Sequence, residues 1–208
     1  MNLSGLRERQ QRRFAFAFSA AAISLSLLTL SACASDPLAE QYRAGSGKNY
    51  IAGDGSITEI APENRGEPVT FSGTDQAGDV VDSRDYLGEI TVVNFWYAGC
   101  APCRIEAPLL ERAFEATAST GAQFVGVNVR DQAETVVTFN TEFGVSYPSI
   151  IDTQGGAQLA FSTNVPPNAV PTTLILDRQG RVAARILGAL ADVSILTTIV
   201  TDISHETS

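Results

Sequence analysis

The sequence predicts an α/β domain with a mixed central sheet covered by helices. Short β-branched runs such as TVVNFWY (91–97) and QFVGVNV (123–129) have the length and composition of buried strands. Segments with helical spacing of apolar residues alternate with these runs, as in sheets whose parallel strands are joined by helices. The last two apolar runs, 171–177 and 181–187, are separated only by a tight turn, so these two strands must be antiparallel.

Each element follows from a local pattern. VTFSG and DVVDS, within residues 69–83, predict a hairpin at the start of the domain. A helix is expected from Pro102 to about Thr120, because Ile105, Leu109, Leu110 and Phe114 recur at helical spacing before Gly121. The later elements are expected in the order helix 133–143, strand 149–152, helix 156–162, strands 171–177 and 181–187, and a helix from Asp192 to about Ser204.

Residues 1–32 have the layout of an export signal. Four arginines precede an uncharged apolar run, residues 14–30, which is short for a membrane span. Leu30-Ser31-Ala32-Cys33 resembles the bacterial lipobox, which implies cleavage before Cys33 and lipidation of its thiol. We therefore expect a lipid-anchored protein at the extracytoplasmic face of the cell membrane. The alternative is a simple membrane anchor with a free, buried cysteine.

A polar segment separates this signal from the domain. Residues 33–59 are rich in Ala, Gly, Ser and Asp without apolar periodicity, which predicts a flexible lipid-anchored tether ahead of a domain at 60–208. Loss of residues 1–32 removes four arginines and one glutamate, so the net charge falls from −9 to −12. Such an acidic chain is not expected to bind nucleic acid, nor to adhere to anionic lipid by charge alone.

The chain has three cysteines, and lipidation of Cys33 would leave Cys100 and Cys103 as a pair. In WYAGCAPCRIEAP, residues 96–108, Cys100 follows a predicted strand where a helix begins. The partial positive charge of a helix N-terminus lowers the pKa of a thiol there. We therefore expect the Cys100 thiolate to attack a partner disulfide, or the Cys100 sulfur to be the one that a partner thiolate attacks. Cys103 lies one turn inside the helix and is expected to resolve the mixed disulfide.

Glu106 lies three residues after Cys103, on the same side of the predicted helix. A buried carboxyl at this position would have a raised pKa and could exchange a proton with the resolving thiol. A solvated helix glutamate is the alternative, and spacing leaves both open.

Together, NFWYAGCAPCRIEAP and the later AVPTTLILD resemble the TlpA/ResA-like family of membrane-tethered thioredoxin-fold thiol-disulfide oxidoreductases. The shared motifs are a Trp ahead of a CxPC pair, a Glu three residues after it, and Val-Pro-Thr. The resemblance implies a thioredoxin-like fold with a central helix–strand insert. It also implies reduction of disulfides in exported proteins, including apocytochrome c, by the Cys100/Cys103 dithiol, which becomes a redox-active disulfide without a further cofactor. A membrane electron-transfer protein would be the redox partner of a monomer.

Carried over by position, the resemblance makes Cys100 the exposed nucleophile, Cys103 the resolving thiol and Glu106 the proton relay. The expected substrate-binding residues are Trp96, Ala101, Pro102, Val170 and Pro171. The Val170–Pro171 bond is expected to be cis, which would turn the Val170 backbone toward an extended substrate. The sequence departs from thioredoxin at Asn94, where thioredoxin has a buried Asp. This departure removes one candidate proton relay and makes Glu106 more important as the other.

Other functions remain open from the sequence. The same pair could donate disulfides as an oxidase, since the fold permits both directions. A peroxidase, a structural disulfide and a non-catalytic lipoprotein are further alternatives. A metal-handling protein would need more ligands, yet the one histidine is His205 near the C-terminus and the one methionine is Met1.

Overall fold

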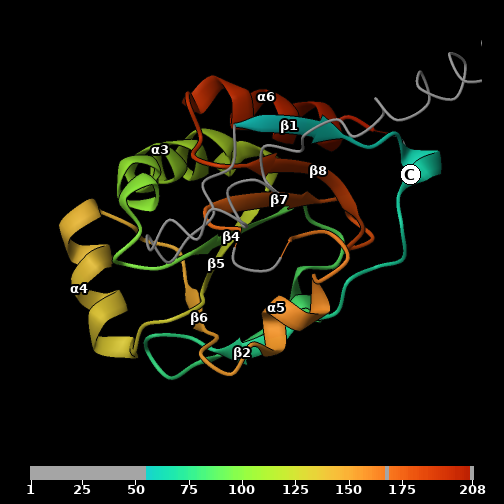
Figure 1. Cartoon of the computed structure of the whole chain (residues 1–208). Helices are drawn as coiled ribbons and strands as arrows, with labels where there is room; N and C mark the ends of the chain where they lie inside the picture. The colour runs from blue at the N-terminus through green and yellow to red at the C-terminus, as the bar shows by residue number, and fades with distance from the viewer. Residues whose placement is uncertain (1–54, 167–168, 207–208) are drawn as a thin grey trace, which may run out of the picture. The chain divides into compact units, whose positions relative to one another are not determined.

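The structure is a computed structural model that describes residues 55–166 and 169–206. Figure 1 shows the order of its elements. The strands are β1 (Ser56–Glu59), β2 (Ser72–Thr74), β3 (Val80–Asp82), β4 (Thr91–Trp96), β5 (Gln123–Asn128), β6 (Ser149–Ile151), β7 (Thr172–Leu176) and β8 (Val182–Leu187). The α-helices are α3 (Ala101–Thr117), α4 (Ala133–Phe143), α5 (Gly156–Ala160) and α6 (Val193–Ser204).

Six strands form the central sheet in the order β1-β8-β7-β4-β5-β6. Strands β4, β5 and β6 are parallel, whereas β7, β8 and β1 continue the sheet in antiparallel fashion. The mixed sheet is therefore confirmed, as is the antiparallel pair β7–β8. The predicted hairpin is also confirmed, since β2 and β3 pair as a separate two-stranded sheet.

Strand β4 lies inside the sheet, and the cysteine pair follows its carboxyl end. All six of its residues are buried, which explains why it reads as a continuous apolar run. Successive side chains point to opposite faces of a strand. Val92 accordingly joins an apolar cluster with residues of α3 and α6, whereas Val93 and Phe95 join a second cluster that includes Phe71 and Phe161.

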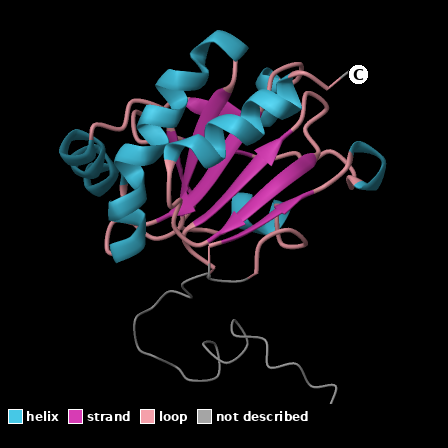
Figure 2. Cartoon of the chain, turned by 90° about the horizontal axis from the view of Figure 1, so that it is seen from above, coloured by secondary structure: helices cyan, strands magenta, loops and turns pink. Residues whose placement is uncertain are grey.

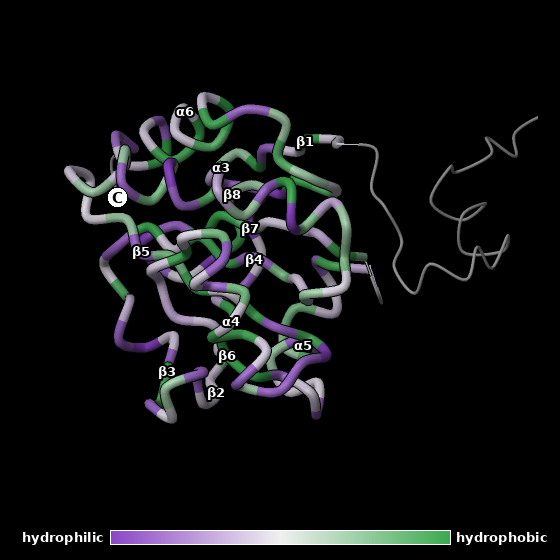
Figure 3. Tube along the Cα trace, turned by 90° about the vertical axis from the view of Figure 1, so that its left-hand side faces the viewer, coloured by the Kyte–Doolittle hydropathy of each residue, from purple (hydrophilic) through white to green (hydrophobic). Residues whose placement is uncertain are grey.

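Helices α3 and α6 pack side by side over one face of the sheet (Figures 1 and 2). Helix α6 begins as predicted, because the Asp192 carboxylate accepts a 2.8 Å hydrogen bond from the Ser194 backbone N–H. Its buried residues recur at helical spacing, and Figure 3 shows the matching change of hydropathy along the helix. These buried residues are Leu196, Ile199, Val200 and Ile203.

The opposite face is covered by α5 and the β2–β3 hairpin (Figure 1). The Phe161 ring lies 5.1 Å from that of Phe71 and 5.4 Å from that of Phe95, so it joins this layer to β4. The predicted helix–strand insert corresponds to α4 and β6, and β6 extends the sheet beyond β5.

The predicted tether was too long at its C-terminal end. Residues Ser56–Glu59 form β1, which pairs with β8 at the edge of the sheet. All four residues are exposed, so this strand lacks the apolar alternation that would reveal it in the sequence. The predicted signal, Cys33 and most of the predicted tether lie outside the described residues. Within the described ranges, no helix is long and apolar enough to cross a bilayer.

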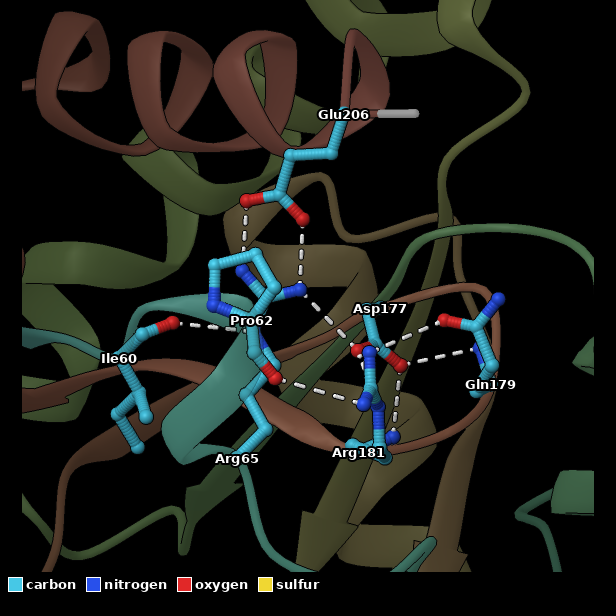
Figure 4. Close-up of polar contacts among 7 residues, drawn as sticks. All are labelled: Ile60, Pro62, Arg65, Asp177, Gln179, Arg181 and Glu206. Carbon is cyan, nitrogen blue, oxygen red and sulfur yellow. Dashed lines mark hydrogen bonds and ion pairs between the residues drawn. The ribbon is translucent and has the colours of Figure 1, made fainter. Parts of the chain in front are cut away.

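A buried arginine ties the start of the domain to its end (Figure 4). Arg65 donates to the Glu206 carboxylate through two 2.6 Å bonds and to the Asp177 carboxylate at 3.1 Å. The Arg65 and Asp177 side chains are each only 3% exposed. Asp177 also accepts a 2.8 Å bond from the side chain of Arg181. We call Arg65, Asp177 and Glu206 the Arg65 clasp.

Candidate active site

Cys100 and Cys103 form a disulfide at the N-terminus of α3, just after β4, with their Cα atoms 5.2 Å apart. Cys100 is the N-cap residue of α3, and its sulfur accepts a 3.3 Å hydrogen bond from the Cys103 backbone N–H. Pro102 lies in the first helical turn, where its missing N–H is not needed. After reduction, this helix N-terminus would stabilise a thiolate at Cys100.

The expectation that Cys100 is exposed is wrong for the disulfide form. Cys100 is 0% exposed and Cys103 2% exposed, and both belong to an apolar cluster that includes Trp96 and Val170. The sequence places Cys100 at a helix start, but it does not show which distant segments cover the sulfur. Of the residues between the cysteines, Ala101 is exposed and Pro102 half-buried.

Glu106 is buried, so its interpretation as a solvated helix residue is wrong. It is 1% exposed, whereas the neighbouring Ile105 is 68% exposed. Its carboxylate accepts 2.9 Å hydrogen bonds from the Asn94 side-chain amide and the Leu190 backbone N–H. Burial raises the pKa of Glu106 to about 8, against the lowering effect of these two bonds. The carboxyl group can therefore gain or lose a proton near neutral pH.

Asn94 connects this carboxyl group to the neighbouring strand. Its side-chain amide also donates a 3.1 Å hydrogen bond to the Thr173 hydroxyl, and Asn94 pairs with Thr173 across β4 and β7. The bonds of Asn94 and Leu190 to Glu106 were missed by sequence reasoning. Leu190 in particular is 84 positions from Glu106 and makes its bond through the backbone, so its side chain gives no signal.

The peptide bond between Val170 and Pro171 is cis, as predicted. Val170 also lines a groove of about 270 Å³ whose walls are mostly apolar. The residues lining it are Phe95, Val129, Gly155, Gln158, Leu159, Ser162, Val165, Pro166, Ala169 and Val170.

Trp96 has a clear structural role at the end of β4. It is 4% exposed, and its ring lies 4.2 Å from that of Phe139 in α4. Trp96 and Cys103 also line a common small cavity. Trp96 therefore forms part of the wall behind Cys103.

The described residues contain no group of three or more His, Cys, Asp or Glu side chains that could hold a metal ion. His205 lies at the C-terminal cap of α6. In a site of this kind the redox chemistry resides in the cysteine pair itself.

A thioredoxin fold with a CxPC disulfide at a helix N-terminus and a cis proline defines the chain as a thiol-disulfide oxidoreductase. It belongs to the AhpC/TSA family, whose model matches residues 66–185.

Curated relatives carry related names. The chain is 32% identical over 117 residues to the thiol-disulfide oxidoreductase ResA of Geobacillus kaustophilus, covering 56% of this chain and 65% of that protein. It is 28% identical over 142 residues to ResA of Bacillus subtilis, covering 68% and 74%. It is also 33% identical over 132 residues to the thiol:disulfide interchange protein HelX of Rhodobacter capsulatus, covering 64% and 68%.

Solved structures support the same fold. A DsbF homologue from Corynebacterium diphtheriae matches with a TM-score of 0.63 and 31% identity, over 72% of this chain and 94% of that one. A secreted thiol-disulfide isomerase from Corynebacterium glutamicum matches with a TM-score of 0.65 and 28% identity, over 76% and 97%.

Proposed function

We propose that this chain reduces disulfides in exported proteins at the outer face of the cell membrane, with oxidised apocytochrome c as a client. The observation that carries the proposal is the buried Glu106, three residues after Cys103 on α3, in a helix that is capped by Cys100. This arrangement gives the two cysteines different tasks and supplies a proton acceptor for the second.

The reaction begins with the reduced chain. The Cys100 thiolate attacks a client disulfide, forming a mixed disulfide and releasing one client thiolate, which takes up a proton. Cys103 then loses its proton to Glu106 in its ionised form, which is the minor form near pH 7 at a pKa of about 8, and the Cys103 thiolate attacks the Cys100 sulfur. The second client thiolate leaves and is protonated. The client gains two electrons and two protons, and the chain ends as the Cys100–Cys103 disulfide.

The pKa of Glu106 suits this task. A pKa of about 8 lies close to the roughly 8.5 of an ordinary thiol, so proton transfer between the two groups costs little free energy. An exposed glutamate, with a pKa about four units below that of the thiol, would be a poor proton acceptor.

Client binding is proposed at Val170. An extended client segment could pair with its main chain, in the manner of an added strand. The neighbouring groove of about 270 Å³ offers apolar contacts for a client side chain near the reacting cysteine. In this scheme the exposed Ala101 and the half-buried Pro102 complete the surface that the client meets, and the buried Pro171 orients Val170 through the cis bond.

The location is proposed from the sequence and the relatives. Lipidation of Cys33 would hold the protein, as a monomer, at the outer face of the membrane. The structural relative from Corynebacterium glutamicum is a secreted thiol-disulfide isomerase, which supports an extracytoplasmic setting. A membrane electron-transfer protein would return the disulfide to the dithiol form.

Substrate trapping and peptide reduction test this function. In the full chain, Cys103→Ser should accumulate mixed disulfides with exported proteins, and Cys100→Ser/Cys103→Ser is the control. The reduced protein should also reduce a peptide containing an oxidised CxxCH segment, at one peptide per chain by mass spectrometry. If the disulfide form instead oxidises the reduced peptide to completion, the chain is an oxidase and the proposed direction is wrong.

A further inference from the structure

The loop that follows β5 holds the turn that precedes Cys100. In this turn, residues 97–100, the Cys100 backbone N–H donates to the Tyr97 carbonyl at 3.1 Å. The Asp131 carboxylate accepts a 2.6 Å hydrogen bond from the Ala98 backbone N–H. The Arg130 guanidinium lies over the Tyr97 ring, 4.3 Å from its centre. The loop after one parallel strand therefore fixes the turn after its neighbour.

Asp131 is itself held in place by Asn128, the last residue of β5. The side-chain NH₂ of Asn128 donates to the Asp131 carboxylate at 2.9 Å. The side-chain oxygen of Asn128, Oδ1, accepts from the backbone N–H groups of Arg130 and Asp131 at 3.0 and 2.7 Å. Asn128 is 0% exposed. One oxygen of Asp131, Oδ2, accepts both the Ala98 and the Asn128 bonds. The carboxylate is therefore presented to the cysteine turn in one orientation.

The Asp131 carboxylate contacts the backbone two residues before Cys100. Its partner Ala98 precedes Cys100 by two residues, so the backbone at the two positions is within about 7 Å. A negative charge at this range opposes a thiolate at Cys100, whereas the helix N-terminus favours one.

The other charged groups around the turn come from three elements. Arg130 lies over Tyr97, and Arg104 of α3 reaches the Ala98 carbonyl at 3.5 Å. Arg104 is paired with Glu142 of α4 at 3.1 Å. Glu106 also lies in α3, three residues beyond Cys103, and Asn94 and Leu190 bind its carboxyl group. The guanidinium groups favour a thiolate at Cys100, whereas the Asp131 carboxylate, which contacts the turn through the Ala98 N–H, opposes one.

We infer that Asp131 is a positioning residue that fixes the cysteine turn and keeps the reduction potential of the Cys100–Cys103 pair low. A less stable thiolate makes the dithiol form a stronger reductant, because the disulfide is then favoured at equilibrium. The inference rests on the proposed reductase function and names the residue that biases the pair toward it.

Asp131→Asn separates charge from geometry. Because a single oxygen accepts both bonds, the amide oxygen of Asn can replace it while the charge is lost. In the full chain with Cys33→Ala, we expect the pKa of the Cys100 thiol to fall and the dithiol–disulfide equilibrium to shift three- to tenfold toward the dithiol. That shift is about 15–30 mV. Asp82→Asn removes an equal charge from a capping carboxylate in the hairpin and should leave both quantities unchanged.

The inference is overturned if Asp131→Asn leaves the thiol pKa and the potential at wild-type values while Asp82→Asn behaves identically. Asp131→Ala gives a second readout, because it also removes the acceptor of the Ala98 N–H. It should shift the potential in the same direction and broaden the amide NMR signals of residues 97–100. The wild-type potential itself tests the reductase proposal, whereas the difference between variant and wild type tests Asp131, so the two failures are distinguishable.

Discussion

The side-chain amide of Asn94 lies 2.9 Å from the Glu106 carboxylate, so that a neutral donor on β4 faces a buried acid on α3. A second carboxyl group at position 94 would share a site with Glu106, and like charges would push their pKa values apart. With Asn there, position 94 carries no carboxyl group, and burial raises the pKa of Glu106 to about 8. The departure from thioredoxin at Asn94 thus coincides with the site of the proposed proton acceptor.

Asn94→Ala should raise the pKa of Glu106 further above its value of about 8, because the bond that Asn94 donates lowers it. The loss of this buried hydrogen bond, which leaves the carboxyl group with the Leu190 N–H alone, should also cost about 1–3 kcal/mol of stability. Carbon NMR of the Glu106 carboxyl group measures the titration. Thr173→Val is the matched control, since it removes the other Asn94 partner and keeps the bond to Glu106. Equal pKa values of Glu106 in both variants would show that the Asn94 hydrogen bond does not lower the pKa of Glu106.

Glu106→Gln should alter how stability depends on pH. The folded chain holds the Glu106 proton up to about pH 8, whereas the unfolded chain releases it near 4.5. Wild-type stability should therefore fall as pH rises between these values, by an amount on the order of a few kcal/mol. The variant should lack this component of the slope. Urea unfolding of the oxidised protein from pH 5 to 9 measures both, and parallel curves would contradict the raised pKa.

Gly126→Ala should destabilise the wall behind Cys103. A Cβ atom at this position would lie 2.2 Å from the Ser149 hydroxyl oxygen and 2.8 Å from the Trp96 indole nitrogen. Such overpacking costs about 1–3 kcal/mol. Gly66→Ala is the control, because no atom lies within 4 Å of its added Cβ. Thermal unfolding compares the two variants. Equal melting temperatures would mean that Ser149 and Trp96 move to accommodate the added Cβ atom without a cost in stability.

Arg65→Met should break the Arg65 clasp and leave the buried Asp177 carboxylate with one fewer cation. Removing one partner of a buried pair typically costs about 3–5 kcal/mol. Arg84→Met is the control, because the Arg84 side chain is 74% exposed and its pair with Asp82 is screened by water. Chemical unfolding measures the difference. A cost for Arg65→Met no larger than for Arg84→Met would show that the clasp contributes little.

The elements around the cysteines could be predicted because their signals are local. Strand β4 is a continuous apolar run, Pro102 and Gly121 bound helix α3 with its final 3-10 turn, and Asp192 caps α6. The cis bond at Pro171 was expected only because the cysteine motif and Val-Pro-Thr occur together.

The missed features depend on contacts between distant segments. Strand β1 is an exposed edge strand, so only its pairing with β8 defines it. Spacing left the burial of Glu106 open, and its carboxylate is in fact bound by the Leu190 backbone N–H, 84 positions away. The covered position of Cys100 has the same origin, because its apolar cluster includes Val170, 70 positions away.

The reduction potential of the Cys100–Cys103 pair tests the central claim most directly. The full chain with Cys33→Ala, equilibrated in detergent against defined thiol buffers, gives this value from the fraction of disulfide. We predict a potential close to the roughly −270 mV of thioredoxin, as a disulfide reductase requires. A potential close to the roughly −120 mV of DsbA would show that the chain donates disulfides, and would contradict the proposed reduction of apocytochrome c.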